Sequence, residues 1–62
     1  MSELAHIVAI AEHMLDHFGE AAAGIMDARA RHHREHDEED GALLWQRVGT
    51  AIRELQRLRG SR

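Results

Sequence analysis

The chain contains no cysteine, proline, lysine, tyrosine or asparagine, and one tryptophan and one phenylalanine are its only large aromatic residues. Without cysteine, no disulfide can stabilise the fold. The apolar runs are far shorter than the ~20 residues that cross a bilayer, and no basic region of a signal peptide opens the chain. We therefore expect a cytoplasmic protein with no membrane segment.

The length of 62 residues permits one small domain, residues 1–62, with a limited core. Chains of this size usually need a metal, an oligomer or a larger complex to fold stably. The formal charge is -3 with neutral histidines, and all eight basic residues are arginine. Protonation of the six histidines would reverse the sign of the net charge in mildly acidic solution.

The N-terminal half carries one continuous apolar stripe at helical spacing. Each step along it is three or four residues, or a sum of these, which is typical of one face of an α-helix. Ser2 is the expected N-cap. The stripe keeps its phase through Gly19, so we predict one helix over about 3–35, straight or kinked at Gly19; the alternative is a helix end with Gly19 in the left-handed conformation. The stripe residues are Leu4, Ile7, Val8, Ala11, Met14, Leu15, Phe18, Ala22, Ile25 and Met26.

An acidic segment interrupts both stripes at 36–41 and predicts a turn at about 36–37. Asp37 is the expected N-cap of a second helix over about 38–59, with an alternative cap at Asp40. The second helix has a main stripe and, beside it, a second row formed by Trp45 and Ile52. Its main stripe comprises Leu44, Val48, Ala51, Leu55 and Leu58.

The combined apolar face of this second helix is wider than one helix would cover. Two helices joined by a short turn lie antiparallel, so the sequence predicts an all-α, two-helix hairpin. Because a lone hairpin leaves apolar surface exposed, we predict a homodimer that forms a four-helix bundle; the alternative is a hairpin that folds on an unidentified protein partner. The expected interface residues are Trp45, Ile52, Leu44, Val48, Leu55, Phe18 and Leu15.

Three segments carry a resemblance: 17–22 (HFGEAA), 37–41 (DEEDG) and 45–55 (WQRVGTAIREL). Their pattern resembles small uncharacterised helical proteins of alphaproteobacteria, in which H-x-G-E-x-A precedes an acidic turn and W-x-x-V-x-x-A-I-x-x-L follows it. This chain has His36-Asp37 where that pattern has Gly-Asp. The resemblance implies a helical hairpin of bacterial origin and implies no activity.

Histidine pairs are the chemically suggestive feature. His13 and His17, and likewise His32 and His36, are four residues apart and share one helix face. Such a pair can hold zinc or another divalent metal when carboxylates complete the site, although tetrahedral zinc needs three or four ligands. A solvated polar face rich in histidine is the simpler interpretation, so we expect no cofactor.

Catalysis is not expected. The chain offers no cysteine, lysine or tyrosine as nucleophile, and two of its three hydroxyl side chains lie at the termini. Arginines gather late in each predicted helix, but net negative charge and few aromatic residues argue against nucleic-acid binding. We therefore predict a non-catalytic protein-interaction or regulatory module. A metal-binding or pH-responsive histidine protein and a nucleic-acid accessory protein are the alternatives.

Overall fold

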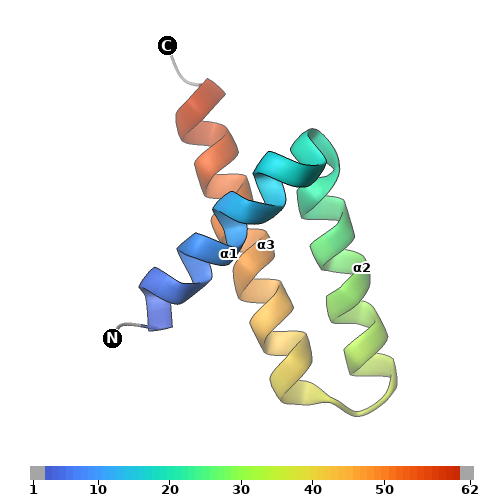
Figure 1. Ribbon diagram of the computed structural model, residues 1–62. Coiled ribbons are helices and arrows are strands. Elements are labelled where there is room, and N and C mark those ends of the chain that lie inside the picture. Colours follow the sequence, from blue (N-terminus) through green and yellow to red (C-terminus); the bar gives the residue numbers. More distant parts are fainter. Residues whose placement is uncertain (1–2, 61–62) are drawn as a thin grey trace.

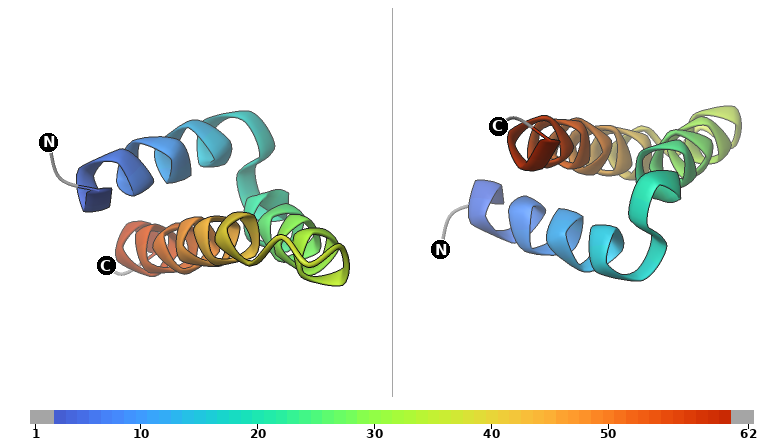
Figure 2. Two further views of the ribbon diagram at one scale, coloured as in Figure 1. Left: turned by 90° about the horizontal axis from the view of Figure 1, so that it is seen from below. Right: turned by 90° about the horizontal axis from the view of Figure 1, so that it is seen from above.

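The computed structural model describes residues 3–60 and is helical over all of them except the turn at 36–38. Its elements are α1 (Glu3–Phe18), the short 3-10 helix η1 (Gly19–Ala21), α2 (Ala22–Glu35) and α3 (Glu39–Gly60). The prediction of an all-α chain is confirmed. Helices α2 and α3 lie antiparallel and side by side, and α1 crosses α3 (Figures 1 and 2).

The first helix ends at Phe18, so the structure has two helices where the sequence analysis favoured one over 3–35. Gly19 has φ 55°, the left-handed conformation of the alternative prediction. L-residues pay roughly 1–2 kcal/mol for that conformation, whereas glycine has no Cβ to clash. The left-handed residue turns the chain without shifting the apolar phase, which is why periodicity alone did not reveal the break.

The end of α2 is a Schellman motif. The amide of Asp37 donates to the carbonyl of Arg34 at 3.2 Å, and the amide of Glu38 donates to that of His33 at 2.8 Å. This pairing satisfies carbonyls that the helix end would otherwise leave without partners. Asp37 has φ 57° and occupies the position where glycine is usual.

The prediction of Asp37 as the N-cap of the second helix is therefore wrong. Helix α3 begins at Glu39, and the amide of Ala42 donates to the carbonyl of Glu38 at 2.9 Å. Glu38 thus occupies the capping position, because its carbonyl accepts the first helical hydrogen bond. Ser2, the expected N-cap of the first helix, lies outside the described residues.

The core lies where α1 and α2 both meet α3. Met26, Val48 and Ile52 are fully buried in it. The wide apolar face of α3, which the sequence analysis divided between one helix and a second copy, is covered by two helices of the same chain. The buried residues of the core cluster are Ile7, Ala11, Leu15, Ala22, Met26, Val48 and Ile52.

Helices α2 and α3 approach closely at Gly49, which is buried. A Cβ built there would lie 3.5 Å from the Met26 Cβ and 3.4 Å from the Asp27 Oδ1. Arg53, one turn further along α3, forms an ion pair with Asp27 across the same seam. These are ordinary van der Waals distances, so the seam is closely packed without requiring glycine at this position, and the ion pair lies at its solvent edge.

Candidate functional site

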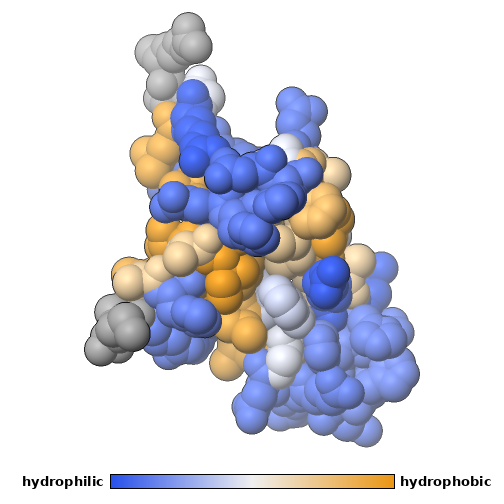
Figure 3. Space-filling model, viewed as in Figure 1, coloured by the Kyte–Doolittle hydropathy of each residue, from blue (hydrophilic) through white to orange (hydrophobic). Residues whose placement is uncertain are grey.

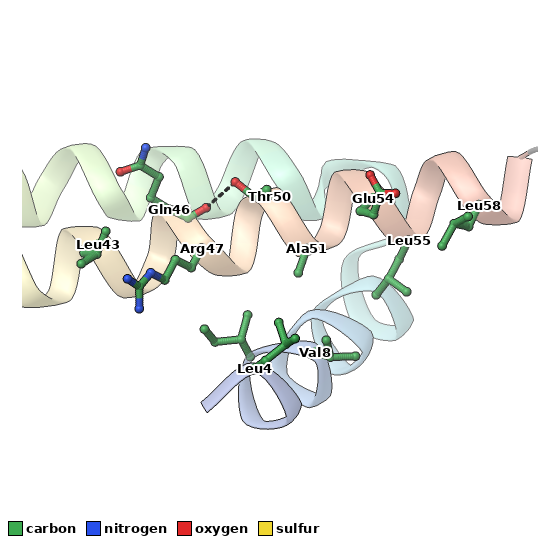
Figure 4. A pocket seen from close by; sticks show the side chains of 11 residues that line it. Leu4, Val8, Leu43, Gln46, Arg47, Thr50, Ala51, Glu54, Leu55 and Leu58 are labelled. Carbon is green, nitrogen blue, oxygen red and sulfur yellow. Dashed lines mark hydrogen bonds between the residues drawn. The ribbon is translucent and has the colours of Figure 1, made fainter. Parts of the chain in front are cut away.

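An open apolar groove runs between α1 and α3. Its volume is about 610 Å³. Figure 4 shows Leu4 and Val8 of α1 pointing toward α3 across it. The lining residues of α1 are Leu4, Ile7 and Val8, and those of α3 are Leu43, Gln46, Arg47, Thr50, Ala51, Glu54, Leu55 and Leu58.

Three leucines leave much of this groove apolar and accessible to water. Leu4 is 68% exposed, Leu43 47% and Leu58 56%. Figure 3 shows apolar surface gathered where α1 meets α3, with polar surface over the turn and the adjoining end of α2. A contiguous apolar patch with a polar surround is typical of a protein-interaction site.

The polar residues of the groove carry both signs of charge. Arg47 donates to Glu3 of α1 at 2.8 Å, which ties the start of α1 to the middle of α3. Arg57 forms an ion pair with Glu54 one turn earlier. A hydrogen bond from Arg57, and secondarily its positive charge, lower the pKa of the Glu54 carboxyl below its usual value of 4.5. Glu54 therefore remains a carboxylate at neutral pH, opposite in sign to Arg47.

Trp45 packs within the chain. Its ring stacks on His33 of α2 with ring centroids 6.5 Å apart, and the Arg29 guanidinium carbon lies 5.5 Å from the ring centroid. The half-buried indole thus closes the contact between α2 and α3 near the turn. An aromatic face that meets a cation and a second ring gains quadrupole attraction in addition to apolar burial.

The expected interface residues fall into three groups. Ile52, Val48 and Leu15 lie in the core of the single chain. Trp45, Leu44 and Leu55 are half-buried, and of these Leu55 lines the groove. Phe18 is 46% exposed at the end of α1, outside the groove.

Sequence reasoning missed the groove itself. Leu43 carried the available signal, because it is a large apolar residue that belongs to neither row of the second helix. Leu4, Val8 and Leu58 were placed on the core stripes, and nothing in their spacing shows that the stripe ends are left open. Their exposure depends on the angle at which α1 crosses α3, after which the chain changes direction at Gly19.

The structure brings both predicted histidine pairs into ring contact. Ring centroids are 4.2 Å apart for His13 and His17, and 4.4 Å apart for His32 and His36. The Nδ1 of His36 donates to the carbonyl of His32 at 2.8 Å, so this nitrogen is engaged. Within residues 3–60, no three His, Asp or Glu side chains form a group that could hold a metal ion.

A further histidine contact joins the turn to α2. His33 Nδ1 and Glu38 Oε2 lie 2.5 Å apart, a short hydrogen bond at the solvent surface. Gly41 faces the same ring, since a Cβ built there would lie 2.8 Å from His33 Nδ1. The acidic turn is thus held against the end of α2, and this histidine is part of its packing.

Three of the four arginines of α3 pair with carboxylates of the same chain. Arg47, Arg53 and Arg57 pair with Glu3, Asp27 and Glu54, respectively. Such pairing offsets the positive charge that phosphate binding requires. The arginines therefore do not form a uniformly basic face along this helix.

Comparison of the chain with protein-family models, with curated proteins and with solved structures found no match. The resemblance to small alphaproteobacterial proteins therefore stays a prediction. Over residues 3–60, none of the helices combines the length and the apolar character that crossing a bilayer requires.

Proposed function

We propose that this chain is a non-catalytic protein-interaction module that acts as a homodimer, with the groove between α1 and α3 as its interface. The observation that carries the proposal is the apolar groove with three exposed leucines. In such a dimer α1 and α3 of each copy form the four-helix bundle, and α2 lies outside it. This differs from a bundle of two hairpins, because α2 already covers the other side of α3.

The chemistry of the described residues supports a non-catalytic role. The hydroxyl of Thr50, the one hydroxyl side chain within residues 3–60, donates to the carbonyl of Gln46 at 3.1 Å (Figure 4). This hydroxyl is thus engaged by the backbone of its own helix, and Glu54, the carboxylate one turn further along, is paired with Arg57, so the two are not arranged as nucleophile and general base. The groove instead offers apolar area with a polar rim, which suits binding of another apolar helix face.

The expected affinity follows from the exposed leucines. Full burial of a leucine side chain contributes about 1.5–3 kcal/mol. Because Leu4, Leu43 and Leu58 are about half exposed, covering them contributes about 1 kcal/mol each, or roughly 6 kcal/mol for two copies. Association costs about 4 kcal/mol or more in lost freedom of motion. The three leucines alone therefore leave a net of about 2 kcal/mol, and the other groove residues must contribute about as much again to give a weak dimer with a dissociation constant of about 1 mM, which corresponds to about 4 kcal/mol.

Sedimentation equilibrium of the untagged protein from about 50 µM to about 5 mM, a range that brackets this dissociation constant, tests the proposal. The weight-average mass should rise from near one chain toward two across that range. Leu58→Gln should shift the transition to higher concentration with little change in the circular dichroism spectrum, because Leu58 lies at the exposed end of the groove. Phe18→Gln is the matched control, since Phe18 is similarly exposed but lies outside the groove.

Two outcomes would contradict the proposal. One is a single-chain mass at every concentration. The other is an equal weakening by Leu58→Gln and Phe18→Gln, which would mean that the groove is not the contact surface.

A further inference from the structure

We infer that a second copy of this chain occupies the groove in one register, with the two α3 helices antiparallel and the two-fold axis between Thr50 and Ala51. This inference rests on the proposed homodimer and specifies its geometry. In a two-fold interface each residue i that meets residue j of the partner is matched by j meeting i. A helix can pair with itself in this way only if its sequence is self-complementary on reversal.

The groove residues of α3 have this property. Reversal about the point between residues 50 and 51 exchanges Leu43 with Leu58 and Arg47 with Glu54. The same reversal exchanges Gln46 with Leu55 and Thr50 with Ala51. Every groove residue of α3 therefore meets another groove residue of α3. Apolar side chains thus meet at both ends, and opposite charges meet one turn further in.

The centre of the register suits a close helix contact. Thr50 and Ala51 are the residues next to the axis, and both are small. The positions 43, 47, 50, 54 and 58 are separated by three or four residues, which places them on one face of α3. The charges and the leucines therefore lie along one line that a facing helix can follow.

The charges also discriminate against the parallel arrangement. In a parallel two-fold pair each residue faces its own copy, so Arg47 would face Arg47 and Glu54 would face Glu54. Like charges placed opposite each other weaken an interface, whereas the antiparallel register places two opposite-charge pairs across it. Arg47 already approaches Glu3 within its own chain, so Glu54 of the second copy would add a second carboxylate to it.

A charge-exchange experiment tests the register. Arg47→Glu alone and Glu54→Arg alone should each weaken the homodimer by about tenfold or more, because each places two like-charge pairs across the interface. An equimolar mixture of the two variants should recover the wild-type affinity as a heterodimer, since both opposite-charge pairs are restored. Failure of the mixture to associate more tightly than either variant alone would overturn the register.

Disulfide cross-linking gives a second, independent measurement. Because the chain has no native cysteine, only the introduced cysteines can form a disulfide. Thr50→Cys lies next to the axis and should form a covalent dimer on mild oxidation. Leu43→Cys alone should not, because residues 43 and 58 are 15 positions apart along the helix and the two copies of residue 43 would be about 22 Å apart. A mixture of Leu43→Cys and Leu58→Cys should cross-link. Cross-linking of Leu43→Cys with itself would overturn the antiparallel register.

Failure of the register and failure of the proposed function give different results. A wild-type protein that remains a single chain at all concentrations refutes the homodimer and the register together. The homodimer stands and the register is refuted if the wild-type protein dimerises, mixing the two charge variants restores no affinity, and the Leu43→Cys variant cross-links with itself.

Discussion

Two glycines that look alike in the sequence should respond in opposite ways to alanine. Gly19 and Gly24 lie five residues apart in the same apolar-periodic segment, and an added Cβ would meet nothing within 4 Å at either position. Any difference between Gly19→Ala and Gly24→Ala therefore comes from the backbone. Gly24 lies inside α2 with ordinary helical dihedral angles, whereas Gly19 has φ 55°.

The expected magnitudes follow from these conformations. Gly24→Ala should raise the free energy of unfolding by about 1 kcal/mol, the difference in helix propensity between the two residues. Gly19→Ala should lower it by about 1 kcal/mol, because the left-handed penalty of roughly 1–2 kcal/mol outweighs the reduced entropy of the unfolded chain. The two variants should thus differ by about 2 kcal/mol, or roughly 10 °C in midpoint temperature for a domain of this size.

Urea denaturation followed by far-ultraviolet circular dichroism measures both variants. Protein concentration must be held constant, because self-association makes apparent stability depend on it. The single tryptophan provides a second probe of the same transition. Stabilisation by both substitutions would refute the reasoning, since one continuous helix through Gly19 would benefit from alanine at either position.

Two further predictions concern the turn and the groove. Asp37→Gly should stabilise the protein by a few tenths to about 1 kcal/mol in the same urea assay, because Asp37 holds the left-handed position of a Schellman motif without the freedom of glycine; a loss of stability would contradict this account. The pKa of Glu54 is lower in the folded protein than its usual value of 4.5. The stabilisation that this carboxylate contributes is therefore complete above about pH 4.5 and is lost as the pH falls through the lowered pKa. Glu54→Gln should therefore lose slightly less stability than the wild type on acidification from about pH 5 to about pH 3, with a small difference because both Glu54 and Arg57 are exposed; a steeper loss in the variant would argue against the ion pair.

The helical class of this chain and the limits of its last helix could be predicted from the sequence. Apolar spacing of three and four residues indicates helices whatever their tertiary arrangement. The second helix was predicted over about 38–59 and is observed over Glu39–Gly60. This agreement reflects a long, strongly periodic segment with an acidic first turn.

The break at Gly19 could not be predicted from periodicity. Phase records the rotation of residues about a helix axis, and it says nothing about a change in the direction of that axis. One left-handed residue and a turn of 3-10 helix redirected the chain and kept the stripe in phase. The conformation of Asp37 was missed for a related reason, because aspartate before an acidic turn fits an N-cap as well as it fits the end of the preceding helix.

The burial of Ile52 within a single chain follows from the same break. A single long first helix cannot cover the whole apolar face of the second helix, so the sequence analysis placed Trp45 and Ile52 among the residues of a homodimer interface. With α1 and α2 as separate helices, both pack against α3, and Arg29 and His33 of α2 contact Trp45. The apolar surface left over is then the groove beside Leu43 and Leu58, which becomes visible only when the crossing of α1 over α3 is known.

The arrangement of α1 has a consequence for how the chain assembles. Helices α2 and α3 are joined by three residues, so the first contacts between them close only a short loop. The ion pair of Glu3 with Arg47, in contrast, joins residues that are 44 positions apart. The entropy lost on closing a loop grows with its length, so nearby contacts form first. We expect α2 and α3 to pair early and to provide the surface on which α1 docks last. Native-state hydrogen exchange should then show α1 opening at lower free energy than the other two helices, which would make the N-terminal quarter of the chain the part that detaches while the rest stays folded.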